Sequence, residues 1–292
     1  MPLYREVGLM TLDTRPLRSV LYVPATHARA MEKARGLNAD VVVLDLEDAV
    51  LPDQKTAARD AVRVALTQGG FGASLVLVRV NGQDTPWGKD DIATLARAEL
   101  DGIVLPKVNR RRDIEAVASA CDHPLWAMIE TPLGVLKAGQ IAGHGRVAGL
   151  IVGTNDLSAD LKCTPSADRL ALRTSLQMVV VAARARGAVC IDGVFNAFQD
   201  VAGFQAECEQ GRGFGFDGKS LIHPSQIALA NSVFAPTQAE LDLAQRQIDA
   251  FAQAEQAGQA IAVLDGHIVE NLHVEAARTL LARHSQIQQQ ES

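Results

Sequence analysis

The chain is poor in the residues that mark several specialised classes of protein. Only 4% of its 292 residues are aromatic, and it contains four cysteines. No two cysteines form a C-x-x-C pair, so the sequence excludes a zinc or redox framework built on cysteine and indicates buried, reduced thiols. The cysteines are Cys121, Cys163, Cys190 and Cys208.

Basic charge is also scarce. Lysine and arginine total 28 against 34 aspartates and glutamates, which leaves a net charge of -6. The one dense basic run covers residues 110–112. Because contact with phosphate backbones needs clustered Lys and Arg, we expect no nucleic-acid partner.

Long apolar runs are missing. No window reaches the roughly 18 uninterrupted apolar residues of a membrane helix. Residues 1–18 mix charged side chains with short apolar stretches and lack the apolar core of a signal peptide. The sequence therefore predicts a soluble cytoplasmic protein with no membrane partner.

What the sequence does contain is an alternation of short apolar runs with helical patterns. The runs are rich in Val, Ile and Leu and too short for buried helices, which is typical of strands covered on both faces. Ala- and charge-rich stretches such as Pro52–Gln68 and Arg110–Cys121 lie between them. The predicted strands are Ser19–Pro24, Ala39–Asp48, Ser74–Asn81, Gly102–Val108, Pro124–Thr131, Val147–Thr154, Ala188–Val194 and Gly215–His223.

Eight such units predict an α/β protein with a (β/α)8 TIM barrel. An open doubly wound sheet is the alternative, but it commonly carries a Gly-rich loop after its first strand, where this chain has Pro24-Ala25-Thr26. We expect a barrel catalytic domain in residues 1–234 and a C-terminal lid or oligomerisation extension in residues 235–292. The extension is predicted to hold two helices, Thr237–Gly258 and Val274–His284, before a disordered polar tail.

Seven of the predicted strands end in ionisable groups. Active sites of such barrels collect at the C-terminal ends of the strands. Because buried charges are costly unless they are paired or bound to a metal, this ring of charges predicts a site with a bound cation. The groups are Asp45, Glu47, Asp48, Arg79, Lys107, Glu130, Asp156, Asp192, Lys219 and His223.

Glu130 and Asp156 form the sharpest pair, because they close neighbouring strands whose axes lie about 4.8 Å apart. Two carboxylates this close repel each other unless a cation lies between them. Oxygen ligands without a nearby cysteine favour a hard ion, Mg²⁺ or Mn²⁺. The alternative is that the two acids cap a helix or pair with arginine, with Asp156 as an N-cap residue.

Arg79 ends the third predicted strand and points at the same site. Its forked guanidinium can hold a carboxylate through two hydrogen bonds. A salt bridge to Asp45 or Glu47 is a compatible alternative. Lys107 could form a Schiff base only as a neutral amine, and the surrounding ring of charges argues against that state.

Seven segments, in order along the chain, resemble the citrate lyase β-subunit-like branch of the HpcH/HpaI aldolase family. They cover most of the predicted barrel, and LDGHIVENLHVEAARTLLAR near the C-terminus is similar to the family's lid segment. The seven segments are RSVLYVP (18–24), ADVVVLDLEDAV (39–50), VRVNG (78–82), LPKV (105–108), IETPLG (129–134), GTNDLSADL (153–161) and GKSLIHPSQI (218–227).

This resemblance implies a Mg²⁺-dependent carbon–carbon lyase on a barrel that forms homotrimers or higher homo-oligomers. The substrate would be a 3-hydroxy-3-carboxy acyl thioester of citryl, malyl or citramalyl type, carried by coenzyme A or acyl carrier protein. Cleavage would give an oxoacid and an acyl thioester. The alternatives are a malyl-CoA-type thioesterase, a carrier-free hydroxy-oxo-acid aldolase and a non-catalytic subunit of a larger lyase complex.

The same resemblance implies roles for particular residues. Glu130 and Asp156 would hold Mg²⁺, Arg79 would stabilise developing charge, and Arg18 would lie near the acyl carrier. Backbone amides around residues 153–155 would lie near the substrate carboxylate. The implied substrate-binding residues are Arg18, Arg79, Glu130, Thr154 and Asn155.

Two segments depart from the family pattern. The loop after the first strand reads Pro24-Ala25-Thr26 where P-G-S/N is usual, close to the thioester carrier. The lid reads Ile268-Val269-Glu270 where M-I-D is usual. Glu270 keeps the carboxylate as a candidate catalytic acid or base, one methylene longer, from the same or a neighbouring subunit. Asp265 nearby could substitute for it.

Overall fold

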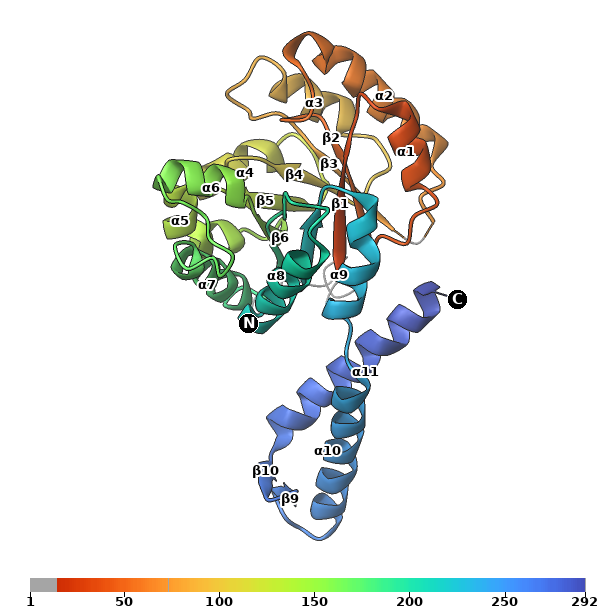
Figure 1. The fold of residues 1–292 in the computed structure, drawn as a ribbon, viewed down its shortest axis with the longest axis vertical. Coiled ribbons are helices and arrows are strands. Elements are labelled where there is room, and N and C mark those ends of the chain that lie inside the picture. The colour runs from red at the N-terminus through yellow and green to blue at the C-terminus, as the bar shows by residue number, and fades with distance from the viewer. Residues whose placement is uncertain (1–14, 73, 292) are drawn as a thin grey trace. The chain divides into compact units, whose positions relative to one another are not determined.

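A computed structural model describes residues 15–72 and 74–291, and its main feature is a closed barrel of parallel strands (Figure 1). The strands follow one another around the barrel in chain order, and β8 closes it by pairing with β1. This confirms the predicted (β/α)8 barrel, and each strand lies inside the apolar run predicted for it. The strands are β1 (Ser19–Pro24), β2 (Val41–Asp45), β3 (Leu75–Arg79), β4 (Gly102–Leu105), β5 (Leu125–Ile129), β6 (Val147–Val152), β7 (Val189–Asp192) and β8 (Gly218–Leu221).

Helices lie around the outside of the strands (Figure 1). In α2, Ala58, Val62 and Ala65 recur every three or four residues and are buried, as in an amphipathic helix against a core. Helix α5 begins with a proline, and the Thr131 side chain accepts a hydrogen bond from the Gly134 amide as its cap. The helices of this unit are α1 (Ala28–Ala34), α2 (Lys55–Gln68), α3 (Gly88–Leu95), α4 (Arg111–Ala118), α5 (Pro132–Ala142), α6 (Thr154–Leu161), α7 (Arg173–Arg184), α8 (Val201–Phe214) and α9 (Ile227–Phe234).

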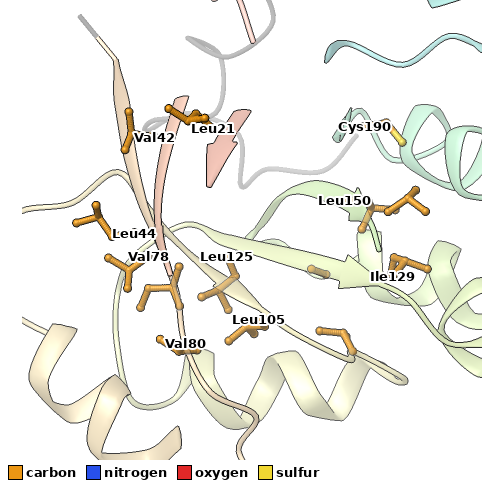
Figure 2. Close-up of a cluster of buried hydrophobic side chains, with 14 of the residues drawn as sticks. Leu21, Val42, Leu44, Val78, Val80, Leu105, Leu125, Ile129, Leu150 and Cys190 are labelled. Carbon is orange, nitrogen blue, oxygen red and sulfur yellow. The ribbon is translucent and has the colours of Figure 1, made fainter. Parts of the chain in front are cut away.

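The largest hydrophobic core lies between the strands and this layer of helices (Figure 2). Alternate residues of each strand point outward, and Leu21, Val42 and Val78 therefore cluster with Val62 and Ile114 of the helices. The intervening residues point into the barrel. A side chain near a strand end therefore faces either the helices or the barrel interior, and its position in this alternation decides which.

A buried ion pair closes the amino end of the barrel. Arg18 Nε and Nη2 donate hydrogen bonds of 2.9 Å to the two carboxylate oxygens of Asp40, and its backbone amide donates a third at 2.7 Å. The hydroxyl of Ser19 accepts a hydrogen bond of 3.0 Å from the Asp40 amide. Both charges are shielded from water and satisfied by each other, which is the condition for a tolerable buried ion pair.

Residues 17–234 form one compact unit, and the residues after Phe234 belong to a second. In the second unit α10 (Gln238–Gln256) packs against α11 (Asn271–Glu291), and β9 (Ala262–Leu264) pairs with β10 (His267–Val269). Asp265 and Gly266 connect these two strands with φ values of 51° and 80°. Two positive φ values in a two-residue loop are what a type I′ hairpin turn requires.

Helix α11 extends beyond the end that the sequence predicts. It runs to Glu291, so the expectation of a disordered polar tail after His284 is wrong for the described residues. The tail is rich in glutamine, which is a good helix former, and Ile287 within it is buried. None of the helices in the described part of the chain is long and apolar enough to cross a membrane.

Candidate functional site

A cavity of about 380 Å³ opens among residues at the carboxyl end of the barrel strands. Charged and amide side chains line one part of it, and Pro24, Ala49, Val194 and Ile222 contribute apolar surface. The other residues that line it are Tyr22, Asp45, Asp48, Arg79, Met128, Glu130, Val152, Gly153, Thr154, Asn155, Asp156, Asn196 and Ser220.

Arg79 lies in this cavity and is held by carboxylates. Its Nε and Nη2 atoms donate hydrogen bonds of 2.7 and 2.6 Å to the two oxygens of Asp45. Its Nη1 lies 2.8 Å from Glu47 Oε2 and 3.4 Å from Asp48 Oδ2. The salt bridges considered as an alternative for Arg79 therefore exist, and they fix the guanidinium plane while it still borders the cavity.

Glu130 follows β5 and is buried. The backbone amide of Lys107 donates a hydrogen bond of 2.7 Å to its Oε1 atom, and no described residue donates one to Oε2. Burial raises the pKa of Glu130 from 4.5 to about 7; the Lys107 amide opposes the rise and the nearby Asp156 carboxylate adds to it. The buried negative charge is therefore poorly compensated by the protein.

Asp156 is the third residue of α6, so the alternative in which it caps this helix is wrong; Gly153 holds the cap position. Its side chain is about 40% exposed, and its Oδ1 lies 3.6 Å from the ammonium of Lys107. The same ammonium lies 4.0 Å from Glu47 Oε1. These carboxylates raise the pKa of Lys107 although burial opposes the rise, so the amine stays charged and is unsuited to Schiff-base chemistry.

The amino end of α6 borders the same cavity. Thr154 is the first helical residue and is buried, while Asn155 is exposed and exchanges side-chain hydrogen bonds of 2.8 and 3.4 Å with Asn196. No side chain accepts a hydrogen bond as the cap of this helix. Unused amides at a helix amino end attract anions, so a carboxylate fits there.

The donor set suits Mg²⁺. In the described residues, no three or more His, Cys, Asp or Glu side chains gather as a metal site. Mg²⁺ needs fewer, because it usually takes one or two protein carboxylates and fills its other positions with water and substrate oxygens. Glu130 and Asp156 supply two carboxylates beside one cavity, and the poorly compensated charge of Glu130 would be neutralised by such an ion.

The structure corrects the expectation for Arg18. The residue precedes β1, at the amino end of the barrel, and its side chain is buried against Asp40. The cavity lies at the opposite end of the strands. Arg18 therefore belongs to the ion pair that closes the barrel, and the structure gives it no place in substrate or carrier binding.

Asp192 and Lys219 also differ from the expectation that they join the charged ring. Lys219 Nζ lies 3.1 Å from Asp192 Oδ2 and 2.7 Å from Glu207 Oε1 on α8, and Arg169 Nη1 lies 2.8 Å from Asp192. Burial favours a raised pKa for Asp192, but Lys219 and Arg169 outweigh it and hold the pKa low. By the alternation along their strands, the side chains of Asp192 and Lys219 both point out of the barrel. They neutralise each other between the barrel and α8.

Glu270 lies in the second compact unit, immediately before α11, and is exposed. Its amide donates a hydrogen bond of 3.0 Å to Nδ1 of His273. Asp265, the other candidate carboxylate, forms an ion pair with Arg246 of α10. Of these two carboxylates, Asp265 is held in an ion pair, and Glu270 is not seen in one with any described residue.

Sequence reasoning named two uncharged polar residues of the cavity, Thr154 and Asn155, and missed three others. Tyr22, Ser220 and Asn196 line it but follow no charge pattern. Side chains alternate between the two faces of a strand, and this alternation could have identified Tyr22 and Ser220 as residues that face the barrel interior. Ser220 lies between the outward-facing Lys219 and Leu221, and it therefore points into the barrel.

Gly153 offers a test of the Glu130 position that changes no charge. A methyl group on Gly153 would lie 2.3 Å from Glu130 Oε2, so alanine must displace the carboxylate, although the φ of -94° suits alanine. We expect Gly153→Ala to weaken Mg²⁺ binding at least about 10-fold, measured by calorimetry. Gly139→Ala in α5, where the new methyl group meets nothing within 4 Å, is the control. Wild-type Mg²⁺ affinity in Gly153→Ala would show that Glu130 is not a ligand.

Together these features define a (β/α)8 barrel protein whose carboxyl-end cavity suits a divalent cation and a small carboxylic acid, at the end of the fold where barrel enzymes hold their active sites. The chain belongs to the HpcH/HpaI aldolase/citrate lyase family, whose model matches residues 18–224. This confirms the family resemblance seen in the sequence.

Curated relatives match nearly the whole chain. The (3S)-malyl-CoA thioesterase of Cereibacter sphaeroides is 52% identical over 275 residues, which cover 94% of this chain and 96% of the relative. Citrate lyase subunit beta of Escherichia coli is 34% identical over 291 residues. The match covers 95% of this chain and 96% of the relative. The relatives thus include proteins named for two different reactions.

Solved structures agree with the fold. The protein CitE of Mycobacterium tuberculosis, in complex with magnesium, acetoacetate and coenzyme A, gives a TM-score of 0.78 at 28% identity. It covers 94% of this chain and 99% of its own. The citrate lyase beta subunit of M. tuberculosis, complexed with oxaloacetate and magnesium, gives a TM-score of 0.69 at 31% identity. The match covers 78% of this chain and 100% of that structure's chain.

Proposed function

We propose that this chain is a Mg²⁺-dependent enzyme that hydrolyses a malyl-type thioester of coenzyme A, giving the free hydroxy acid and the thiol. One observation carries the proposal: Glu130, Asp156, Arg79 and the amino end of α6 all border one cavity. The malyl-CoA thioesterase of Cereibacter sphaeroides, 52% identical over nearly its full length, supports hydrolysis as the outcome.

Glu130 and Asp156 would hold the ion, which when bound acts as a Lewis acid on the oxygens of the acyl group. The remaining functions belong to the chain. The free amides at the start of α6 and the Thr154 side chain receive the substrate carboxylate. Arg79 places a fixed positive charge beside the region where negative charge develops, and its ion pairs with Asp45 keep it in that orientation.

Glu270 is the proposed acid or base of the second unit. It is exposed and has a longer reach than aspartate, so it could deliver a proton to the leaving thiolate from the same or a neighbouring subunit. We propose a homotrimer as the assembly, on the strength of the family resemblance. Glu270→Gln would then lower turnover and leave Mg²⁺ binding unchanged.

Carbon–carbon cleavage is the second candidate. The 34% identity to the citrate lyase beta subunit of Escherichia coli favours it, and the same two carboxylates would serve both reactions. The two outcomes use one Michaelis complex and differ in which bond breaks. Hydrolysis breaks the C–S bond with water, whereas lyase cleavage breaks the C2–C3 bond of the malyl group and gives glyoxylate and acetyl-CoA.

Product analysis of the purified chain with malyl-CoA distinguishes the candidates. We expect the thiol of coenzyme A and malate to appear in equal amounts with Mg²⁺, and neither to appear with EDTA. Glyoxylate with acetyl-CoA and no free thiol would instead establish the lyase. Binding of Mg²⁺ and oxoacid without turnover would point to the non-catalytic subunit, and cleavage of free hydroxy-oxo acids to the aldolase.

A further inference from the structure

Two hydroxyl groups in the cavity have no hydrogen-bond partner. Tyr22 Oη and Ser220 Oγ are both buried from water, and their one described polar interaction is with each other, without the geometry of a hydrogen bond. They come from the adjacent strands β1 and β8, and Ser220 lies close enough to Tyr22 to favour the ionised phenol. Both residues line the cavity that also contains Glu130 and Arg79.

Such a pair is unusual in a folded protein. Most buried polar side chains have a partner, and a buried group without one destabilises the fold. The neighbouring Ser19 shows the ordinary arrangement, because its buried hydroxyl accepts a hydrogen bond from Asp40. The two cavity hydroxyls therefore need an explanation outside the packing of the barrel, and a polar atom of a bound ligand supplies one.

The position of the pair indicates which ligand atom this is. Glu130 and Asp156 follow β5 and β6, whereas Tyr22 and Ser220 belong to β1 and β8, on the other side of the closed barrel. An acyl group whose hydroxyl and carboxylate lie at the β5–β6 side directs its remaining polar atom away from that side. In a malyl-type thioester that atom is the thioester carbonyl oxygen.

We propose that Tyr22 Oη and Ser220 Oγ donate hydrogen bonds to the thioester carbonyl oxygen of the bound acyl substrate. This inference rests on the proposed function. When water adds to the carbonyl carbon, the C–O π electrons move to the oxygen, and the pair stabilises that charge until the C–S bond breaks. In lyase cleavage the same oxygen becomes an enolate, so the pair serves either outcome.

Two further observations agree with this role. Burial raises the pKa of the Tyr22 phenol above its ordinary value, although the Arg79 charge opposes this, so the phenol keeps its proton and can donate it. The guanidinium of Arg79 lies 5.3 Å from the centre of the Tyr22 ring, and this cation–π contact helps to fix the orientation of the ring. Phenylalanine at position 22 keeps this contact and removes only the hydroxyl.

The test compares Tyr22→Phe, Ser220→Ala and the double variant with wild type. We expect each single change to lower kcat/KM for malyl-CoA on the order of 100- to 1,000-fold, as for loss of one oxyanion donor. Affinity for acetyl-CoA should fall, while calorimetric binding of Mg²⁺ with oxoacid stays as in wild type. Neither single change should markedly lower Tm, because neither hydroxyl has a hydrogen bond of good geometry inside the protein to lose.

Ser19→Ala is the matched control on the same strand. It should lower Tm, because the Asp40 amide loses its partner, and leave kcat/KM unchanged. Wild-type kcat/KM and acetyl-CoA affinity in both cavity variants would overturn the inference, as would a marked fall in Tm that tracks the activity loss. A wild-type protein that binds no oxoacid with Mg²⁺ would instead refute the proposed function.

Discussion

Replacement of Glu130 with glutamine is expected to abolish Mg²⁺ binding and turnover while making the metal-free protein more stable. Glutamine can still accept the hydrogen bond from the Lys107 amide, so the local backbone stays in place. What is lost is one of the two carboxylates beside the cavity. Since a catalytic metal supplies several kcal/mol of charge stabilisation, turnover should fall roughly 100-fold or more.

The stability gain follows from the raised pKa of Glu130, which burial shifts from 4.5 to about 7. In the unfolded chain this carboxyl ionises at the lower pKa, so the folded state becomes less stable as pH rises from 4.5 to 7. The penalty is fully present above pH 7, where it amounts to about 3 kcal/mol at about 1.4 kcal/mol per pKa unit. Glu130→Gln removes it.

Urea unfolding in EDTA at several pH values between 5 and 8 measures this difference. The variant should be more stable than wild type at pH 8, and the gap should close toward pH 5. Glu115→Gln, an exposed change in α4 that removes only the ion pair with Arg111, is the control and should change neither property. Unchanged Mg²⁺ affinity in Glu130→Gln would contradict the assigned site.

Replacement of Arg79 with methionine is expected to destabilise the barrel and abolish turnover together. The substitution leaves the buried carboxylates of Asp45 and Glu47 without their shared cation. Removal of one partner from a buried ion pair typically costs about 3–5 kcal/mol. Glu47 shows the sensitivity of this cluster, because burial already raises its pKa from 4.5 to about 7 against the opposing charge of Arg79.

Urea unfolding at neutral pH, together with malyl-CoA turnover, measures both effects. Arg63→Met is the control, since Arg63 is exposed and lies 3.9 Å from an exposed Asp60. It should change the free energy of unfolding by less than about 1 kcal/mol. Arg79→Lys separates the two roles: it keeps the charge and part of the stability but loses the forked hydrogen bonds. A loss below about 1 kcal/mol in Arg79→Met would show that other contacts hold the cluster.

The barrel itself was predictable from the sequence because its strands are covered on both faces. Such strands appear as short runs of Val, Ile and Leu, and Val41–Asp45 is an example in which every residue is buried. The end of α11 was not predictable in the same way. A polar tail looks alike in a solvated helix and in a disordered segment, and only the burial of Ile287 distinguishes them.

The candidate site was predicted in part, and the failures have different physical causes. Glu130 and Asp156 lie where the ends of adjacent strands placed them, but Asp192 and Lys219 near other strand ends face α8. A charge near the end of a strand marks the correct end of the barrel without fixing the side on which it points. Tyr22 and Ser220 were missed because the search followed charged residues; the alternation along their strands places both inside the barrel, but their lack of partners is visible only in the structure.

The ion pair of Arg18 with Asp40 has a consequence for how this family changes over time. It closes the barrel at the end opposite the cavity, so this contribution to the stability of the fold comes from side chains outside the candidate site. Residues that line the cavity can then change without loss of this ion pair. Such a division of labour fits a lineage in which relatives 52% and 34% identical to this chain bear the names of a thioesterase and a lyase subunit.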